Sequence, residues 1–286
     1  MTLKLTFCLY LVFFFSAAKV FSQEVSDSTS NDVEETLGDD NLADSTLHEN
    51  NAILFDINTV PAASVYKVWS NVLVDPYDVD ITKKTDTTTI NLTGYFQPIS
   101  GHINSDFGWR KWRWHYGTDI KLRTGDTVRC AFDGLVRIAK RSKSFGYYVV
   151  VRHYNGLETV YGHLSKIITS ANQPIKAGEV LGLGGSTGHS TGPHLHLEFR
   201  YLGNPINPND IVDFQSFHLK CDTMHLCQTQ FNYVTEIRKI RYHLVRRGDT
   251  LFKISRRYGV PVTKLCQLNN IRKTKSLRVG QRIRYT

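Results

Sequence analysis

The sequence predicts two folded units, an antiparallel all-β domain followed by a small α+β unit. Three observations support this. The chain has 286 residues, more than the roughly 100 to 200 of one ordinary domain. Between Pro98 and Pro208, short apolar runs alternate with glycines, which is typical of strands and tight turns. The last 45 residues or so show the order strand, helix, helix, strand.

The N-terminus has the layout of a secretory signal peptide, which we place at residues 1–22. Lys4 precedes an apolar run from Leu5 to Phe15, and small residues follow. A membrane-spanning helix needs about 20 apolar residues, so this run is too short. An uncleaved N-terminal anchor remains an alternative, and with it a membrane contact. Both readings place the folded part outside the cytoplasm.

The charge is distributed unevenly. The chain carries a net charge of +9, yet residues 23–66 contain ten acidic side chains and no Lys or Arg. We expect residues 23–50 to be a disordered acidic leader, because so few apolar side chains cannot form a core. The basic C-terminal tail fits nucleic-acid binding by charge, but the export signal and the lack of interleaved aromatic residues argue against it. We therefore expect no nucleic-acid partner.

Residues 51–94 form a lead-in segment. In it, "AASVYKVWSNVLVDPY" has spacings that predict a short helix, and "TTTINLTGYFQP" alternates like a strand. The connector at residues 211–240 separates the two units, and its "FNYVTEIRKIRYHLV" leads into a strand.

Four cysteines lie beyond the signal segment, and they allow three pairings into two disulfides. We expect Cys221 and Cys227 to form the local pair, which leaves Cys130 and Cys266. A zinc site within "CDTMHLC" is the weaker alternative, since no second ligand cluster accompanies it.

The all-β domain spans residues 95–210, and we expect no helix longer than a turn or two in it. Its clearest element is "HYNGLETVYGH", where Asn155 and Gly156 lie between alternating apolar runs. This pattern predicts a hairpin. His163 comes at the end of its second strand.

The first candidate for a metal-binding site is the motif "HLH". His194 and His196 project from the same face of a strand, because side chains there repeat with period two. Upstream, "HYGTD" offers His115 and Asp119. These two residues and one of the later histidines would supply three ligands of the types that Zn²⁺ prefers, with a fourth position open for water. If "HLH" were absent, a surface turn with a salt bridge would be the better interpretation of "HYGTD".

His163 is a candidate partner of the reacting centre. Hydrolysis of a peptide needs a proton acceptor near pH 7 and a donor to the developing oxyanion, and histidine suits both tasks.

Three motifs, "SDFGWRKWRWHYGTD", "VYGHLS" and "GGSTGHSTGPHLHLEF", resemble the M23 family of zinc metallopeptidases, the lysostaphin and LytM type. The resemblance covers about Tyr95 to Pro208. It implies an antiparallel β-sheet of the duplicated-hybrid-motif type with the active site in a groove across the sheet. By position, it implies the zinc ligands His115, Asp119 and His196 and the catalytic residues His163 and His194.

The resemblance is greatest to M23 proteins of the Bacteroidetes. It implies a zinc-dependent peptidoglycan endopeptidase that cleaves stem-peptide crosslinks, with DD-endopeptidase activity in a Gram-negative setting. The protein would then act in the periplasm or cell envelope, or be secreted. The alternative is a non-catalytic LytM factor that activates a wall amidase. It is disfavoured because such proteins are expected to lack ligands, and all five positions are filled here.

Residues 241–286 resemble a LysM module through "YHLVRRGDTLFKISRRYGVPVTKLCQLNN" and "LRVGQRIRY". Asp249 is the expected cap of a helix from Thr250 to Tyr258 that stops at Gly259. A second helix (262–268) and a strand (282–285) should follow. LysM modules bind N-acetylglucosamine glycans such as peptidoglycan. The resemblance places the sugar groove along Gly248, Asp249, Thr250, Leu251 and Asn270. Twelve Lys and Arg against one Asp from Tyr242 onward would add attraction to acidic surfaces.

Overall fold

The structure, a computed structural model, describes residues 60–110 and 113–286. The predicted signal peptide, the acidic leader and the first part of the lead-in segment lie outside these residues. Within the described ranges, no helix has the length and apolar character needed to cross a membrane.

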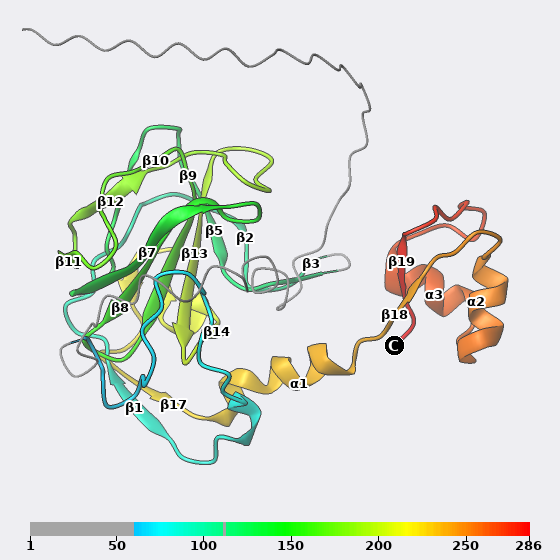
Figure 1. Cartoon of the computed structure of the whole chain (residues 1–286), viewed down its shortest axis with the longest axis horizontal. Coiled ribbons are helices and arrows are strands. Elements are labelled where there is room, and N and C mark those ends of the chain that lie inside the picture. Colours follow the sequence, from blue (N-terminus) through cyan, green and yellow to red (C-terminus); the bar gives the residue numbers. More distant parts are fainter. Residues whose placement is uncertain (1–59, 111–112) are drawn as a thin grey trace, which may run out of the picture. The chain divides into compact units, whose positions relative to one another are not determined.

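The first folded unit is built on an eight-stranded antiparallel sheet of order β11-β7-β8-β9-β13-β5-β2, with β14 paired to β13 (Figure 1). The mainly β prediction for this unit is therefore confirmed. Its strands are β2 (Ile103–Ser105), β5 (Thr118–Lys121), β7 (Gly134–Ser142), β8 (Gly146–His153), β9 (Glu158–Leu164), β11 (Pro174–Ile175), β13 (His194–Tyr201) and β14 (Asn204–Ile206).

The predicted hairpin is the join between β8 and β9. Gly156 has a positive φ of 91°, which suits the tight turn, and Val150 pairs with Val160 across the ladder. The long β-branched strands of this hairpin form the centre of the sheet, as the alternating sequence predicts.

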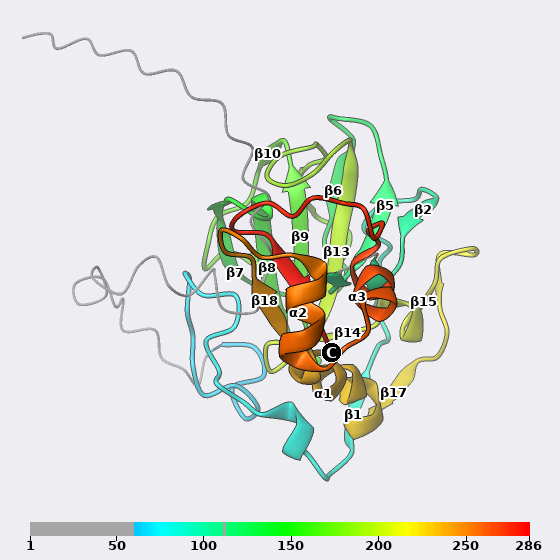
Figure 2. The ribbon, with the colours of Figure 1, turned by 90° about the vertical axis from the view of Figure 1, so that its right-hand side faces the viewer.

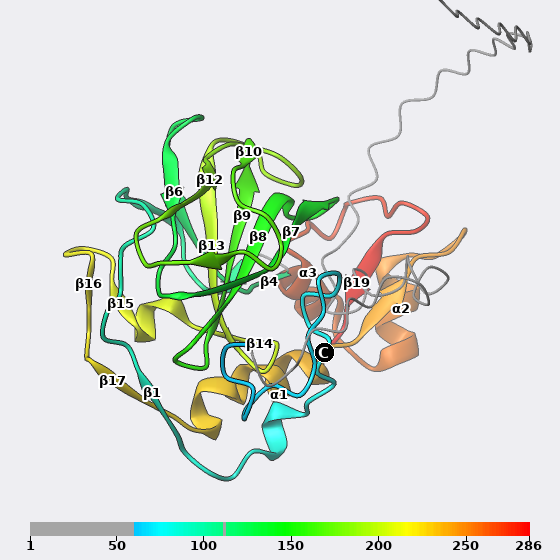
Figure 3. The same cartoon turned by 60° about the vertical axis from the view of Figure 1, so that its left-hand side comes forward.

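Shorter strands surround the large sheet. The pair β3 and β4 ends at His115, and β10, β12 and β6 form a three-stranded sheet. Figure 3 shows β1 and β17 side by side, apart from the large sheet. These strands are β1 (Thr88–Asn91), β3 (Gly108–Arg110), β4 (Arg113–His115), β6 (Thr127–Arg129), β10 (Lys166–Ile167), β12 (Val180–Leu183), β15 (Val212–Asp213), β16 (His218–Leu219) and β17 (Thr223–Leu226).

The two faces of the large sheet differ in kind. On β13, Leu195, Leu197 and Phe199 point into the main apolar core. The alternate positions put His196 and Glu198 on the other face, where both are buried. That face also has a small apolar cluster, which includes Val74 and Phe145. One strand thus separates an apolar core from a buried polar layer.

The lead-in segment contains no helix between residues 62 and 77, so that prediction was wrong. Its backbone is bound by arginines of the sheet instead of by its own helical hydrogen bonds. Arg137 donates to the carbonyls of Ser70 (2.7 Å), Leu73 (2.6 Å) and Val74 (2.6 Å). A short 3-10 helix, η3 (Ile81–Lys83), precedes β1, and β1 confirms the strand predicted in this segment.

The connector contains a helix that the sequence analysis did not predict, α1 (Asn232–Lys239). Phe231 and Val234 pack into the main core, which explains why this segment becomes helical. The 3-10 helices η4 (Pro208–Asp210) and η5 (Gln228–Phe231) also lie here. The strand predicted at the end of the connector is present as β18 (Tyr242–Leu244).

All four described cysteines are free thiols, so the expected pair of Cys221 and Cys227 is not formed. The reason is that β17 runs extended between them. Four strand residues span about 13 Å, whereas the Cα atoms of a disulfide lie about 4.4 to 6.8 Å apart.

The second unit has the predicted order β18, α2 (Leu251–Tyr258), α3 (Val262–Asn269) and β19 (Arg282–Arg284) (Figure 2). Its core contains Leu251, Ile254 and Leu265. The helix cap is Thr250, whose side chain accepts from Lys253 N, so the assignment of Asp249 as the cap was wrong. A carboxylate of Asp249 instead accepts from Arg246 N (2.7 Å). Gly259 ends α2 in the left-handed conformation, as expected.

Candidate metal centre

Strand register brings the "HLH" and "HYGTD" motifs together. On β13, His196 lies directly opposite Asp119 of β5 on one side and Gly162 of β9 on the other. His115 ends β4, and Gly117 makes the turn into β5. A Cβ at Gly117 would lie 2.5 Å from the Leu197 carbonyl, so glycine is required for this close approach.

Three buried side chains offer ligand atoms to one point. His115 Nε2 lies 3.0 Å from His196 Nδ1 and 3.2 Å from Asp119 Oδ1, and His196 Nδ1 lies 3.0 Å from Asp119 Oδ1. Tetrahedral zinc with bonds of about 2.0 to 2.1 Å requires ligand atoms about 3.3 Å apart. Two imidazole nitrogens and one carboxylate at this spacing therefore fit zinc.

The positively charged side chain of Arg110 lies against this cluster. The Arg110 guanidinium donates to Asp119 Oδ2 and lies 2.6 Å from the ring nitrogens of His115. Burial would raise the pKa of the Asp119 carboxyl, but hydrogen bonds from His115 and His196 hold it far below its usual value. Burial lowers the pKa of His115. The cluster thus combines a permanent anion with a neutral imidazole, which suits metal binding.

Glu198 and Arg200 form a second layer that the sequence analysis missed. His196 Nε2 donates to Glu198 Oε1 (2.9 Å), and Arg200 Nε donates to Glu198 Oε2 (2.5 Å). Burial opposes ionisation of Glu198, but the Arg200 charge and the His196 hydrogen bond lower its pKa to about 2. A carboxylate behind a ligating histidine sets its tautomer and orientation. The period-two pattern of "HLHLEFR" carried this signal, since it places all four polar residues on one face.

His196 lies between two carboxylates. Burial disfavours its charged form, yet hydrogen bonds to Asp119 and Glu198 raise its pKa to about 10. Because Nε2 is held by Glu198, Nδ1 is the nitrogen that faces His115 and Asp119. This orientation points Nδ1 at the shared ligand position.

His163 and His194 lie beside this cluster with their rings 4.7 Å apart, and the His163 ring is 5.7 Å from that of His196. His163 Nδ1 donates to the Thr187 carbonyl (2.8 Å), and His194 Nδ1 donates to the Gly192 carbonyl (2.7 Å). In the neutral form each ring therefore has an unprotonated Nε2. The Nε2 of His194 lies 3.5 Å from Asp119 Oδ1.

His163 has a strained backbone conformation and a buried side chain. It has a positive φ of 63°, a conformation that non-glycine residues adopt at a cost and mainly where the surroundings enforce it. Burial, and then the charges of His196 and His194, lower its pKa to about 3. The imidazole is therefore neutral near pH 7.

The predicted sugar-groove residues lie at two places in the second unit. Gly248, with φ of 85°, and exposed Thr250 lead into α2, while Asn270 caps the end of α3 in the left-handed conformation. The Leu251 side chain is buried in the core of this unit.

The chain matches two family models. Residues 113–208 match Peptidase family M23, and residues 243–285 match the LysM domain. The DD-carboxypeptidase/endopeptidase Mpg of Neisseria meningitidis serogroup B is 45% identical over 116 residues, which are 38% of this chain and 27% of that protein. The peptidoglycan DD-endopeptidase ShyA of Vibrio cholerae is 42% identical over 93 residues, which are 32% of this chain and 22% of that protein.

The matches thus span about a quarter of the length of these curated relatives. Among solved structures, the catalytic domain of the prophage-encoded M23 protein EnpA from Enterococcus faecalis is 32% identical. The match covers 38% of this chain and 95% of that one, with a TM-score of 0.36. Residues 113–208, which carry the histidine and aspartate cluster, form a peptidase family M23 domain, and residues 243–285 form a LysM domain.

Proposed function

We propose that this protein is an exported zinc-dependent endopeptidase that hydrolyses stem-peptide crosslinks of peptidoglycan. The observation that carries the proposal is the convergence of His115, Asp119 and His196 on one point, beside His163 and His194, whose Nδ1 atoms each donate to a backbone carbonyl. Bound zinc would polarise a carbonyl and lower the pKa of water to about 7.

The residues of the site would then have separate roles in metal binding and proton transfer. His115 Nε2, Asp119 and His196 Nδ1 hold the metal, and Glu198 keeps the His196 ring in the required tautomer. His194 takes the proton of the attacking water on Nε2, because its Nδ1 already donates to Gly192.

His163 acts beside it. Because its Nδ1 donates to Thr187, its Nε2 can donate a hydrogen bond to the negative oxygen of the tetrahedral species only when the proton that the attacking water gave to His194 has passed to it. The two histidines present the same tautomer, so they can exchange these roles. Whichever is protonated can return the proton to the leaving amine.

The LysM domain would hold the protein on the glycan of the same polymer, which raises the local concentration of crosslinks at the peptidase domain. A wall substrate implies a site of action outside the cytoplasm, in agreement with the signal peptide predicted at residues 1–22. The names of the Neisseria and Vibrio relatives support DD specificity.

The test is mass spectrometry of muropeptides released from purified sacculi by the zinc-loaded protein. We expect cleaved crosslinks, which a chelator abolishes and added zinc restores. His194→Ala and His163→Ala should lose turnover while keeping one zinc per chain, and His196→Ala should lose the zinc. His225→Ala, at an exposed position on β17, is the control and should behave as the wild type.

Two results would contradict the proposal. Loss of zinc in His194→Ala would show that this residue is a ligand and not the proton acceptor. An absence of released muropeptides from the zinc-loaded wild type would favour the non-catalytic alternative, in which the protein activates an amidase.

A further inference from the structure

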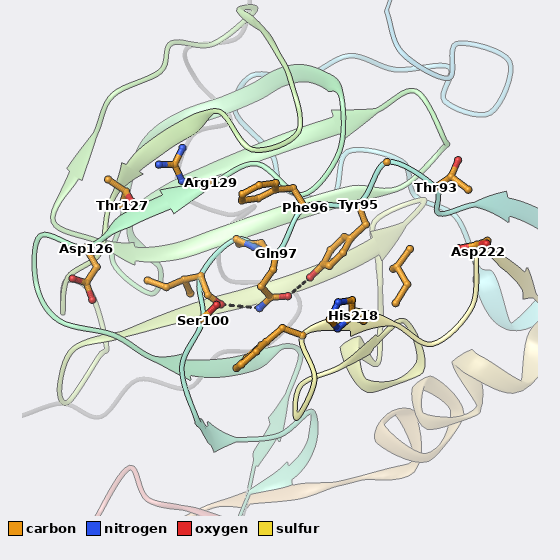
Figure 4. Close-up of a pocket in the computed structure, with 15 residues that line it drawn as sticks. Thr93, Tyr95, Phe96, Gln97, Ser100, Asp126, Thr127, Arg129, His218 and Asp222 are labelled. Carbon is orange, nitrogen blue, oxygen red and sulfur yellow. Dashed lines mark hydrogen bonds between the residues drawn. The ribbon is translucent and has the colours of Figure 1, made fainter.

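A cavity of about 880 Å³, drawn in Figure 4, has none of the residues of the metal cluster in its lining. Two segments that are distant in sequence, 93–100 and 217–222, line most of it. The M23-matched segment contributes Asp126, Thr127 and Arg129 to the lining. Ligand pockets commonly measure roughly 300 to 1,000 Å³. The cavity is therefore large enough for a ligand of several rings, and this chain builds it mainly from residues outside the matched domain.

Aromatic and amide side chains make up the middle of the cavity. Figure 4 shows Tyr95 and Gln97 next to each other, and the Tyr95 hydroxyl donates to the Gln97 side-chain oxygen. Gln97 Nε2 in turn donates to the Ile99 carbonyl (2.7 Å). Phe96 is 44% exposed, an unusual position for a large apolar ring. These contacts hold the amide in place and leave flat apolar surface open to solvent.

A third ring belongs to Phe217, near the end of the turn between β15 and β16. Its φ is 60°, in the left-handed region that bulky residues rarely adopt, and its N–H donates to the Asp213 carbonyl (2.7 Å). Strain of this kind persists where the surrounding structure imposes it, and it is found often at ligand sites. The turn thereby fixes Phe217 as a third aromatic ring of the lining.

The charges of the cavity favour a neutral ligand. Asp126 lies at one end and Asp222 at the other (Figure 4). The lining also contains His218 and Arg129, and Arg129 donates to the Gly178 carbonyl (2.8 Å). Carboxylates at both ends repel an anionic peptide but accept hydrogen bonds from hydroxyl groups. A pyranose ring presents an apolar C–H face to aromatic rings and hydroxyls at its edge, so it matches this lining.

Short backbone links connect the cavity wall to the candidate catalytic residues. The Asp126 carbonyl accepts from Gly184 N (2.8 Å), and the carbonyl of the next residue, Gly185, accepts from His194 N (3.2 Å). The cavity and His194 are thus parts of one hydrogen-bonded framework. A polymer bound in the cavity would therefore be bound to the same folded unit that contains the metal cluster.

We propose that this cavity binds a neutral stretch of hexosamine glycan, as a second glycan site in addition to the LysM domain. This deepens the proposed function, on which it rests for the kind of glycan, because the sugar strand and the crosslinked peptides belong to one polymer. Glycan in the cavity would position the strand relative to the peptidase site.

The test is NMR titration of the zinc-loaded full exported chain with chitotetraose, a neutral N-acetylglucosamine oligomer. We expect two separate sets of shifted amide resonances, one from residues 93–100 and 217–222 and one from the LysM domain. Phe96→Ser and Asp222→Ala should weaken the first binding event at least tenfold and leave the second unchanged. Ile168→Ser removes an apolar side chain that is 53% exposed outside the cavity, and it should change neither.

The proposal is overturned if chitotetraose does not shift the resonances of 93–100 and 217–222. It is also overturned if a free stem tetrapeptide shifts them and the sugar does not, or if Ile168→Ser weakens the first event as much as Phe96→Ser. Failure of the proposed function is separate, because it appears as an absence of muropeptide release from sacculi. Cavity shifts in a chain without that activity would uphold the glycan site alone.

Discussion

One face of the large sheet carries two buried charged clusters with different designs. Near the start of β13, His115, Asp119 and His196 turn their ligand atoms toward one shared point. Toward the other end of the strand, Glu158 on β9 lies opposite Arg200 and binds two arginines. Its Oε1 accepts from Arg137 Nε (2.8 Å) and Arg152 Nε (3.0 Å).

The difference lies in how the charges are satisfied. In the Glu158 cluster, the acid is matched by arginine donors and by the Tyr77 hydroxyl (2.5 Å), and the spare donors of the arginines bind the lead-in backbone. In the histidine cluster, two imidazoles and one carboxylate turn their ligand atoms toward one point, and Arg110 donates to Asp119. A buried acid between two arginines holds the chain together, whereas ligand atoms gathered around one point are suited to a cation.

The largest expected effect comes from Asp119→Ala. Zinc stoichiometry should fall to near zero and crosslink hydrolysis by about 10³-fold or more, because several kcal/mol of transition-state stabilisation depend on the metal. Elemental analysis measures the zinc stoichiometry, and muropeptide release measures crosslink hydrolysis. Asp133→Ala removes a carboxylate from a surface ion pair with Lys176 and is the control. Full zinc occupancy in Asp119→Ala would show that the cluster is not the metal site.

Glu158→Ala should act on stability and not on the metal. It leaves two buried guanidinium groups without their acid, which costs about 3 to 5 kcal/mol in the free energy of unfolding. Urea denaturation measures this cost, and Glu236→Ala on the exposed side of α1 should stay within about 0.5 kcal/mol of the wild type. Loss of zinc from folded Glu158→Ala would break the distinction between the two clusters.

Glu198→Gln tests the connection between the histidine cluster and the Glu158 cluster. Glu198 contacts the candidate ligand His196 on one side and Arg200 on the other. We expect zinc affinity to fall by about 10- to 100-fold, as found when a carboxylate behind a ligating histidine is replaced. Competition with a chromophoric chelator gives the affinity. An unchanged affinity would assign Glu198 to the structural cluster alone.

The smallest expected effect is on the pH dependence of the free energy of unfolding. Burial would raise the pKa of Glu158, but Arg137 and Arg152 lower it below the unfolded value of about 4.3. The stabilisation is therefore complete above that value and is lost as the pH falls through the folded pKa. Between about pH 5 and 3, the free energy of unfolding should fall less steeply in Glu158→Gln than in the wild type. Equal slopes would contradict this assignment.

Local patterns predicted the elements whose stability is local. The β8–β9 hairpin follows from Asn155 and Gly156, and the βααβ order of the LysM domain follows from apolar spacing and Gly259. Residues 62–77 of the lead-in segment and α1 were not predicted correctly, because their conformations depend on distant partners. The lead-in backbone is held by Arg137 and Arg152, and α1 is anchored by Phe231 in the main core.

The residue pattern alone puts His194, His196, Glu198 and Arg200 on one face, because side chains alternate along any strand. The residues that this face meets depend on strand pairing, which the local pattern does not contain. The pairing of β13 with β5 places His196 opposite Asp119, and the pairing with β9 places Arg200 opposite Glu158. These contacts join residues that are distant along the chain, and a shift of one residue in register would turn the whole set to the other face.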